Sequence, residues 1–102
     1  MTDALVVVTT APDEAVAESL AEVLVTEGLA ACVHILPAGR SIYRWQGEVH
    51  KEPEWTLLIK TDRARFAPMR TRLLVLHPYE VPEILALPVE DGNPAYLAWL
   101  KG

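Results

Sequence analysis

The chain has 102 residues, of which 51% are hydrophobic and 23% are charged, and its formal net charge at pH 7 is −5. This length suits one domain and excludes two. We do not expect nucleic-acid binding, because phosphate contacts come mainly from clustered Lys and Arg, and the chain has only nine such residues.

No run of residues approaches the ~18 consecutive apolar positions that a transmembrane helix needs, so no membrane span is expected. Met1–Ala4 leads directly into an apolar stretch, without the basic segment or cleavage pattern of a secretory signal, which predicts a cytoplasmic protein. The single cysteine, Cys32, excludes an intramolecular disulfide. Its alanine and valine neighbours favour a small core residue over a nucleophile.

A buried strand and a helix are the first expected elements. Leu5–Thr10 is a β-branched run that is apolar on both faces, which is typical of a central strand. Pro12 and Asp13 then open a helix, and Gly28 is expected to end it. The buried stripe of this helix consists of Val16, Leu20, Val23 and Leu24.

A long, kinked hairpin is expected next. Ala30–Leu36 has the pattern of a strand, Pro37–Gly39 interrupts it, and Ser41–Trp45 resumes the extended pattern. Gln46–Gly47 supplies the turn, and the return arm runs from Glu48 to Thr61. One side of this arm carries Trp55, Leu57 and Ile59.

The second half of the chain predicts a helix, a strand and a short terminal helix. The helix starts near Phe66, tolerates Pro68 in its first turn and ends before Pro78. A strand at Ile84–Val89 and a short amphipathic helix after Gly92–Pro94 complete the chain. The apolar stripe of the longer helix is Phe66, Met69, Leu73 and Leu76.

This order of elements predicts a single domain over residues 1–102 with the split βαβ arrangement of a ferredoxin-like α+β sandwich. Both main helices then lie on one face of the sheet. The other face should be polar in a monomer, yet the strands are apolar on both sides. Such a patch is larger than a solitary soluble domain normally exposes, and a second copy of the chain would cover it. We therefore predict self-association.

The densest polar cluster precedes the last strand. His77–Glu83 places an imidazole, a phenol and two carboxylates on a connection that two prolines stiffen. His77, Glu80 and Glu83 offer nitrogen and oxygen ligands that suit copper or zinc. In the alternative interpretation, His77 caps the negative end of its helix and the glutamates face water.

Two weaker candidates lie on the expected strands. Cys32 and His34 share one side of a strand and offer a thiolate and an imidazole to one ion, although two ligands are too few for tight binding and ordinary packing is the alternative. Lys60 faces away from the apolar side of its strand. With Tyr43 and Trp45 it is a candidate lining for an anion pocket, and the alternative is a lysine that shields a strand edge.

Six blocks of sequence follow one another along nearly the whole chain. They are Thr10–Glu14, Leu29–Val33, Ser41–Gly47, Ile59–Thr61, His77–Glu83 and Tyr96–Leu100. In this order and spacing they resemble the CutA (divalent-cation tolerance) family. The resemblance implies a ferredoxin-like fold similar to the PII signalling proteins, a tight homotrimer, a cytoplasmic location in most bacteria, and a link to tolerance of copper and other divalent ions.

The resemblance also implies where a metal would bind. In some bacterial members, copper ligation is assigned to a cysteine just before Ala-Pro-Asp-Glu and to two adjacent histidines before Pro-Tyr. This sequence has Thr10 and Leu76 at two of these positions and keeps only His77. We therefore expect a weak site for Cu(II) or another divalent cation, formed by symmetry copies of His77 or with help from Glu80.

Two function classes follow. The first is a trimeric divalent-metal (copper) tolerance protein without catalytic activity, in which His77 and Glu80 are the metal ligands. The second is a PII-like interaction module that binds a small ligand or a protein partner in pockets between subunits. An enzyme is less expected, because no phosphate loop, nucleophile elbow or His-Glu-x-x-His motif is present. The residues expected to edge the pockets are Tyr43, Trp45, Lys60, Tyr79 and Glu83.

Overall fold

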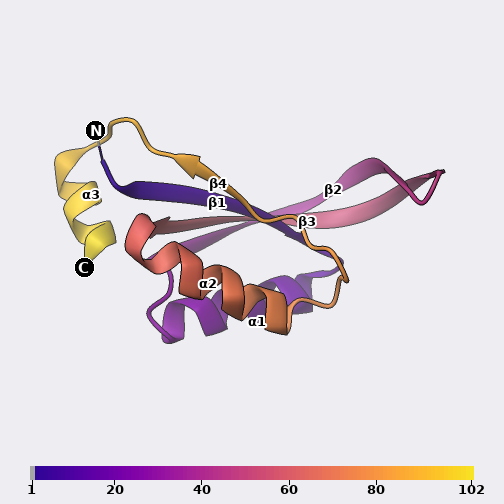
Figure 1. The fold of residues 1–102 in the computed structure, drawn as a ribbon, viewed down its shortest axis with the longest axis horizontal. Helices are drawn as coiled ribbons and strands as arrows, with labels where there is room; N and C mark the ends of the chain where they lie inside the picture. Colours follow the sequence, from indigo (N-terminus) through magenta and orange to yellow (C-terminus); the bar gives the residue numbers. More distant parts are fainter. Residues whose placement is uncertain (1) are drawn as a thin grey trace.

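The computed structural model describes residues 2–102 and has two helices packed on one face of an antiparallel sheet (Figure 1). The sheet contains four strands in the order β2-β3-β1-β4, which is the predicted ferredoxin-like arrangement. The strands are β1 (Ala4–Ala11), β2 (Cys32–Trp45), β3 (Glu48–Asp62) and β4 (Leu85–Pro88). The helices are α1 (Glu14–Thr26), α2 (Arg63–Leu76) and α3 (Pro94–Lys101). No helix in this part of the chain is long and apolar enough to span a membrane.

Helix α1 begins and ends where local chemistry predicts. The side chain of Asp13 accepts a hydrogen bond of 2.8 Å from the backbone N–H of Val16 and so caps the first turn. Gly28 adopts a φ of 73°, the left-handed conformation that terminates many helices. Of the predicted stripe, Leu20 and Leu24 are buried, whereas Val16 and Val23 are only half-buried. Two small residues complete the buried face instead, namely Ala17 and Ala21.

The β2–β3 hairpin extends far beyond the rest of the sheet and makes the molecule 44 Å long (Figure 1). Its turn is Gln46–Gly47, whose φ angles of 51° and 83° suit a tight two-residue hairpin. The expected interruption at Pro37–Gly39 does not divide the strand, which is continuous from Cys32 to Trp45. The pairing register shifts between Leu36 and Gly39 instead. A local irregularity therefore absorbs the extra residues and keeps both arms paired.

Helix α2 starts at Arg63, three residues earlier than predicted, because Asp62 caps it. The Asp62 carboxylate accepts a hydrogen bond of 3.0 Å from the backbone N–H of Arg65. Pro68 thus lies inside the helix and not in its first turn. Of the predicted stripe, Met69 and Leu73 are buried. The last strand, β4, is one residue shorter at each end than expected and forms an edge of the sheet, where Pro88 is tolerated.

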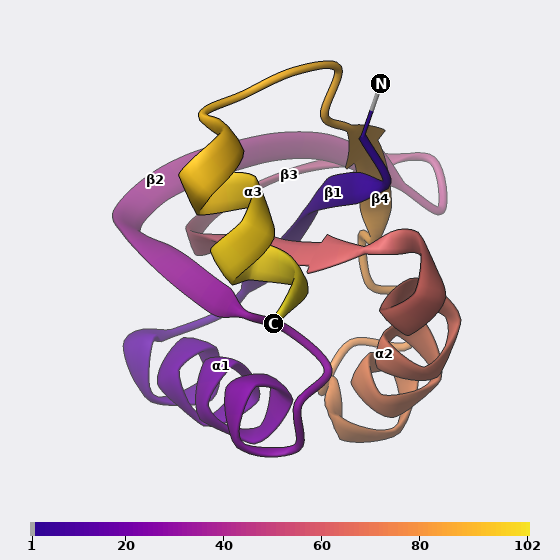
Figure 2. The ribbon, with the colours of Figure 1, turned by 90° about the vertical axis from the view of Figure 1, so that its left-hand side faces the viewer.

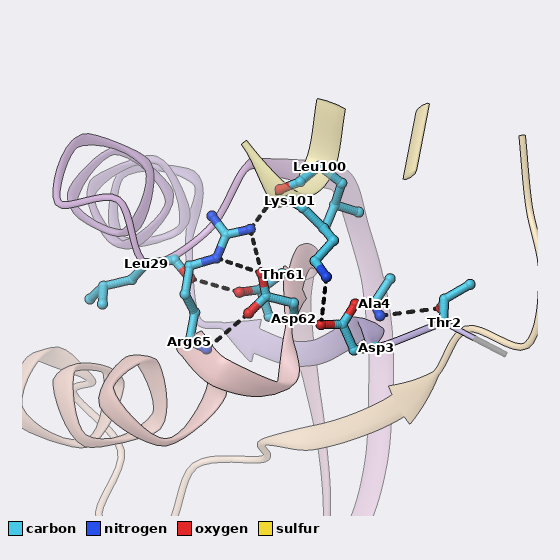
Figure 3. A network of polar contacts seen from close by, with 9 residues as sticks. All are labelled: Thr2, Asp3, Ala4, Leu29, Thr61, Asp62, Arg65, Leu100 and Lys101. Atoms are coloured by element: carbon cyan, nitrogen blue, oxygen red, sulfur yellow. Dashed lines mark hydrogen bonds and ion pairs between the residues drawn. The ribbon is translucent and has the colours of Figure 1, made fainter. Parts of the chain in front are cut away.

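Helix α3 is fastened at the end of the sheet that lies away from the hairpin tip (Figure 1 and Figure 2). Figure 3 shows how Arg65 reaches both Asp62 and the end of α3. The Nη2 atom of Arg65 lies 2.9 Å from a carboxylate oxygen of Asp62 and donates a hydrogen bond of 2.6 Å to the Leu100 carbonyl oxygen. An ion pair of 3.0 Å between Lys101 and Asp3 adds a second link. The terminal helix is therefore held through polar contacts and through the buried side chain of Leu100.

The core lies between the sheet and helices α1 and α2. Leu5, Val7, Leu57 and Ile59 enter it from the sheet, and Leu20, Leu24, Met69 and Leu73 enter it from the helices. Two fully buried threonines share this layer. The Thr61 hydroxyl donates a hydrogen bond of 2.8 Å to the Leu29 carbonyl oxygen. Within residues 2–102, the Thr9 hydroxyl has no hydrogen-bond partner.

The opposite face of the sheet is largely apolar apart from Lys60 and His34, and it is not covered by α1 or α2 (Figure 1). The cross-strand register places Leu58 and Leu85 opposite Val8, and Leu87 opposite Val6. Large parts of Leu85 and Leu87 face solvent, with exposed fractions of 57% and 52%. We call this surface the open face and define it by Val6, Val8, Leu36, Leu58, Leu85 and Leu87. The predicted two-sided apolar character of the sheet is thus present in the fold.

Candidate functional site

A cavity of about 630 Å³ lies where the outer half of the hairpin meets the end of β1 and the connection after α2. In Figure 1 this connection leaves α2 and passes beside β1 and the hairpin before it reaches β4. The volume falls within the range that small-molecule sites usually have, roughly 300–1,000 Å³. We call it the Tyr79 cavity, and its lining includes Tyr43, Trp45, Glu54, Tyr79, Glu80 and Glu83.

The extended strands and the proline-stiffened connection bring these side chains together. Tyr43 and Trp45 are two residues apart on β2 and therefore project from the same face. Tyr43 stands opposite His50 on β3, and their rings stack with centroids 5.3 Å apart. Glu54 comes from β3, at the position opposite Gly39. Pro78 and Pro82 stiffen the loop that supplies the remaining lining residues.

Tyr79 joins the two sides of the cavity. Its hydroxyl donates a hydrogen bond of 2.6 Å to a carboxylate oxygen of Glu54. Burial raises the pKa of Tyr79 well above its usual range, and the Glu54 carboxylate raises it further. Desolvation also raises the pKa of Tyr43, and the nearby carboxylates of Glu52 and Glu54 add to this increase. Tyr79 therefore serves as a hydrogen-bond donor to Glu54.

His77 is 7% exposed, and both of its ring nitrogens have hydrogen-bond partners. Nδ1 accepts a hydrogen bond of 3.1 Å from the backbone N–H of Tyr79. The proton must then lie on Nε2, which donates to the Thr10 carbonyl oxygen at 2.7 Å. In this arrangement His77 fastens the connection to the end of β1. A metal ion reaches either nitrogen only after one of these hydrogen bonds is broken.

The other proposed ligands do not complete a metal site within one chain. Glu80 and Glu83 line the Tyr79 cavity, whereas His77 is directed at Thr10. Cys32 and His34 lie on the side of β2 that belongs to the open face, as their spacing predicts. Across residues 2–102, no three His, Cys, Asp or Glu side chains are arranged to hold a metal ion.

Lys60 does not join Tyr43 and Trp45. It pairs with Val6 and Cys32 in the sheet, six residues along β3 from Glu54, and it is not among the residues that line the cavity. At about 3.3 Å per residue, this separation is roughly 20 Å. The cavity lining includes three glutamates and no lysine, arginine or histidine. Within one chain Lys60 is therefore separate from this cavity, and its place in a pocket between subunits stays a prediction.

Glu54 is a lining residue that the sequence analysis did not single out. It could have been found by counting back from the Gln46–Gly47 turn, which sets the hairpin register from Trp45 and Glu48 onward. Counting in this way places Glu52 and Glu54 on the same face as Tyr43. The Tyr79 hydroxyl, by contrast, comes from a distant part of the chain, and no local sequence pattern predicts its hydrogen bond to Glu54.

Comparison with known proteins shows which family shares this sequence and fold. The family described as CutA1 divalent ion tolerance protein matches residues 5–102. The chain is 53% identical over 96 residues to the divalent-cation tolerance protein CutA of Thermus thermophilus, covering 94% of this chain and 93% of the relative. It is 46% identical to the protein of that name from Pectobacterium atrosepticum, over 97% of this chain and 90% of the relative.

Solved structures agree with the sequence comparison. The Thermus thermophilus Cut A1 structure superimposes with a TM-score of 0.94 at 52% identity, covering 96% of this chain and 95% of that one. CutA1 from Oryza sativa gives a TM-score of 0.93 at 38% identity, covering 97% and 91%. The sequence and the fold match over nearly the full length of these proteins. The chain therefore belongs to the CutA1 divalent ion tolerance family.

Proposed function

We propose that this chain is a non-enzymatic, homotrimeric protein of divalent-cation tolerance. The observation that carries the proposal is the open face, an apolar sheet surface that one copy leaves uncovered. Full burial of one Leu or Val side chain contributes about 1.5–3 kcal/mol, so covering several such side chains favours association. The family resemblance implies that the number of copies is three. The relatives' printed name, divalent-cation tolerance protein, supports the cellular role.

A charge placed on the open face tests the association. Leu85 on β4 and Leu74 on α2 have nearly equal exposed fractions, 57% and 54%. Leu85→Glu introduces a carboxylate into the proposed interface, whereas Leu74→Glu introduces the same group on the outer surface of a helix. We expect light scattering to show smaller species for Leu85→Glu and an unchanged mass for Leu74→Glu. Equal masses for the two variants would contradict an interface on the open face.

Within this proposal, His77 and Glu80 bind Cu(II) or another divalent cation weakly. Imidazole nitrogen and carboxylate oxygen are suitable donors, and both residues lie on the same short connection. The binding is weak because His77 must give up a hydrogen bond to Thr10 or Tyr79. Symmetry copies supply the ligands that a single chain lacks.

Calorimetric titration of Cu(II) into the wild type and His77→Gln tests this role. Circular dichroism and light scattering confirm that the variant keeps its fold and mass. We expect weak heats in the wild type that His77→Gln reduces. Equal heats in both proteins would remove His77 from the metal site.

A second candidate function has a separate observation in its favour. The Tyr79 cavity is large enough for a small molecule and is built from a fixed Tyr79–Glu54 pair. We infer that the chain also works as a PII-like interaction module that binds a small ligand there. Of the five residues expected to edge a pocket between subunits, Tyr43, Trp45, Tyr79 and Glu83 line this cavity of one chain, and Lys60 does not. Protection of the cavity residues by a bound ligand in hydrogen exchange or NMR would support this role.

A further inference from the structure

All the charged side chains that line the Tyr79 cavity are acidic. Glu54, Glu80 and Glu83 are among its lining residues, and the lining contains no basic side chain. Glu54 accepts a hydrogen bond from Tyr79. Glu80 and Glu83 form no ion pair with any residue between 2 and 102. A concave surface with charges of one sign concentrates its field and attracts the opposite charge.

The aromatic side chains of the lining are also suited to contact a cation. Tyr43 and Trp45 are 39% and 42% exposed, so part of each side chain is available to a ligand. Tyr79 lines the same space and is held by its hydrogen bond to Glu54. The face of an aromatic ring carries partial negative charge, and a cation placed over it is attracted. Ile42 and Val81 add apolar surface.

We propose that the Tyr79 cavity binds a small organic cation, in which an ammonium or guanidinium group is carried on an apolar or aromatic body. The inference rests on the interaction-module function proposed above and names the class of its ligand. The carboxylates of Glu80 and Glu83 receive the charged group, and the rings of Tyr43 and Trp45 contact the body.

Other ligand classes fit the cavity less well. An anion such as a nucleotide or a carboxylic acid would meet three carboxylates and no basic group. A bare divalent ion would not find three suitably arranged ligands in this part of the chain, and it would leave most of the roughly 630 Å³ unfilled. An organic cation uses both the charge and the volume.

Three probes with closely similar skeletons separate charge from shape. They are 2-phenylethylamine, which is a cation at pH 7, the neutral 2-phenylethanol, and the anion 3-phenylpropionate. Each is titrated calorimetrically into the full-length, assembled protein. We expect the amine to bind at least about tenfold more tightly than the alcohol, and the anion not to bind measurably. Raising the salt concentration should weaken the binding of the amine but not that of the alcohol, because salt screens exposed charges.

Variants locate the binding. Glu80→Gln with Glu83→Gln keeps the shape of the rim and removes two charges, and Glu22→Gln removes one charge from the exposed surface of α1. We expect the double variant to lower the amine affinity at least fivefold and Glu22→Gln to leave it unchanged. Light scattering verifies that each variant keeps the mass of the wild type. An equal effect of both substitutions, or none, would overturn the assignment to this cavity.

The outcomes distinguish this inference from the function on which it rests. If the amine and the alcohol bind equally and both protect the cavity residues in NMR, the ligand class is wrong while a binding cavity remains. If none of the three probes binds, the organic-cation inference and the interaction-module function both lose their support. The trimer and metal proposals are judged by separate experiments in either case.

Discussion

Replacing Asp62 by alanine should destabilise the protein more than the loss of an ordinary helix cap. Asp62 is 5% exposed, caps α2 through the backbone N–H of Arg65, and pairs with the Arg65 guanidinium at 2.9 Å. The cap contributes about 1 kcal/mol. A hydrogen bond to a charged group contributes a further ~1.5–3 kcal/mol. We therefore expect Asp62→Ala to lower the free energy of unfolding by about 3 kcal/mol.

Asp13→Ala is the matched control, because Asp13 caps α1 with a similar bond of 2.8 Å but has no arginine partner. Asp13→Ala should lower the free energy of unfolding by about 1 kcal/mol. Both variants are unfolded in guanidinium chloride at one protein concentration, since association makes stability depend on concentration. Equal losses for the two variants would refute the view that the Asp62–Arg65 ion pair adds stability beyond the helix cap.

The same pair predicts a dependence on pH. Burial alone would raise the pKa of Asp62, but the hydrogen bonds and the charge of Arg65 outweigh it and hold this pKa below its usual value. A carboxyl whose pKa is lowered by folding stabilises the protein above its unfolded pKa of about 3.9 and loses that contribution as the pH falls through the folded value. The stability gap between wild type and Asp62→Ala should thus narrow below about pH 4. A gap that stays constant down to pH 2 would contradict this pairing.

Two further substitutions test the core and the end of α1. Thr9→Val removes a fully buried hydroxyl that has no hydrogen-bond partner in the described part of the chain. It should therefore raise the free energy of unfolding by about 1 kcal/mol, measured as a higher midpoint of denaturant unfolding. A lower midpoint would show that the hydroxyl has a hydrogen-bond partner. In Gly28→Ala the added Cβ meets no atom within 4 Å, but the alanine must adopt a φ of 73°. This backbone strain alone should lower the free energy of unfolding by about 1 kcal/mol. An unchanged free energy of unfolding would mean that the left-handed conformation is not needed at this position.

The parts of the fold that carry local signals are predictable. Asp13 and Gly28 mark the two ends of α1, and Gln46–Gly47 marks the hairpin turn. The start of α2 was misplaced because Pro68 is most easily tolerated in a first turn, which moved the expected start toward Phe66. The cap provided by Asp62 decided the boundary instead.

The site is predictable only as far as strand alternation reaches. Alternation places Tyr43 and Trp45 on one face, and the structure finds both in the cavity. It also places Lys60 on the open face, and counting residues along β3 separates Lys60 from Glu54 and this cavity within one chain. The hydrogen bond of His77 to Thr10 spans 67 positions in the chain, and no local pattern predicts it.

The mass of the wild-type protein in solution tests the central claim most directly, since one copy leaves the open face in water. Multi-angle light scattering should give about 34 kDa, three times the 11.3 kDa of one chain. A mass of 11.3 kDa at micromolar concentration would contradict the account, because the apolar side of the sheet would then be stable in contact with solvent.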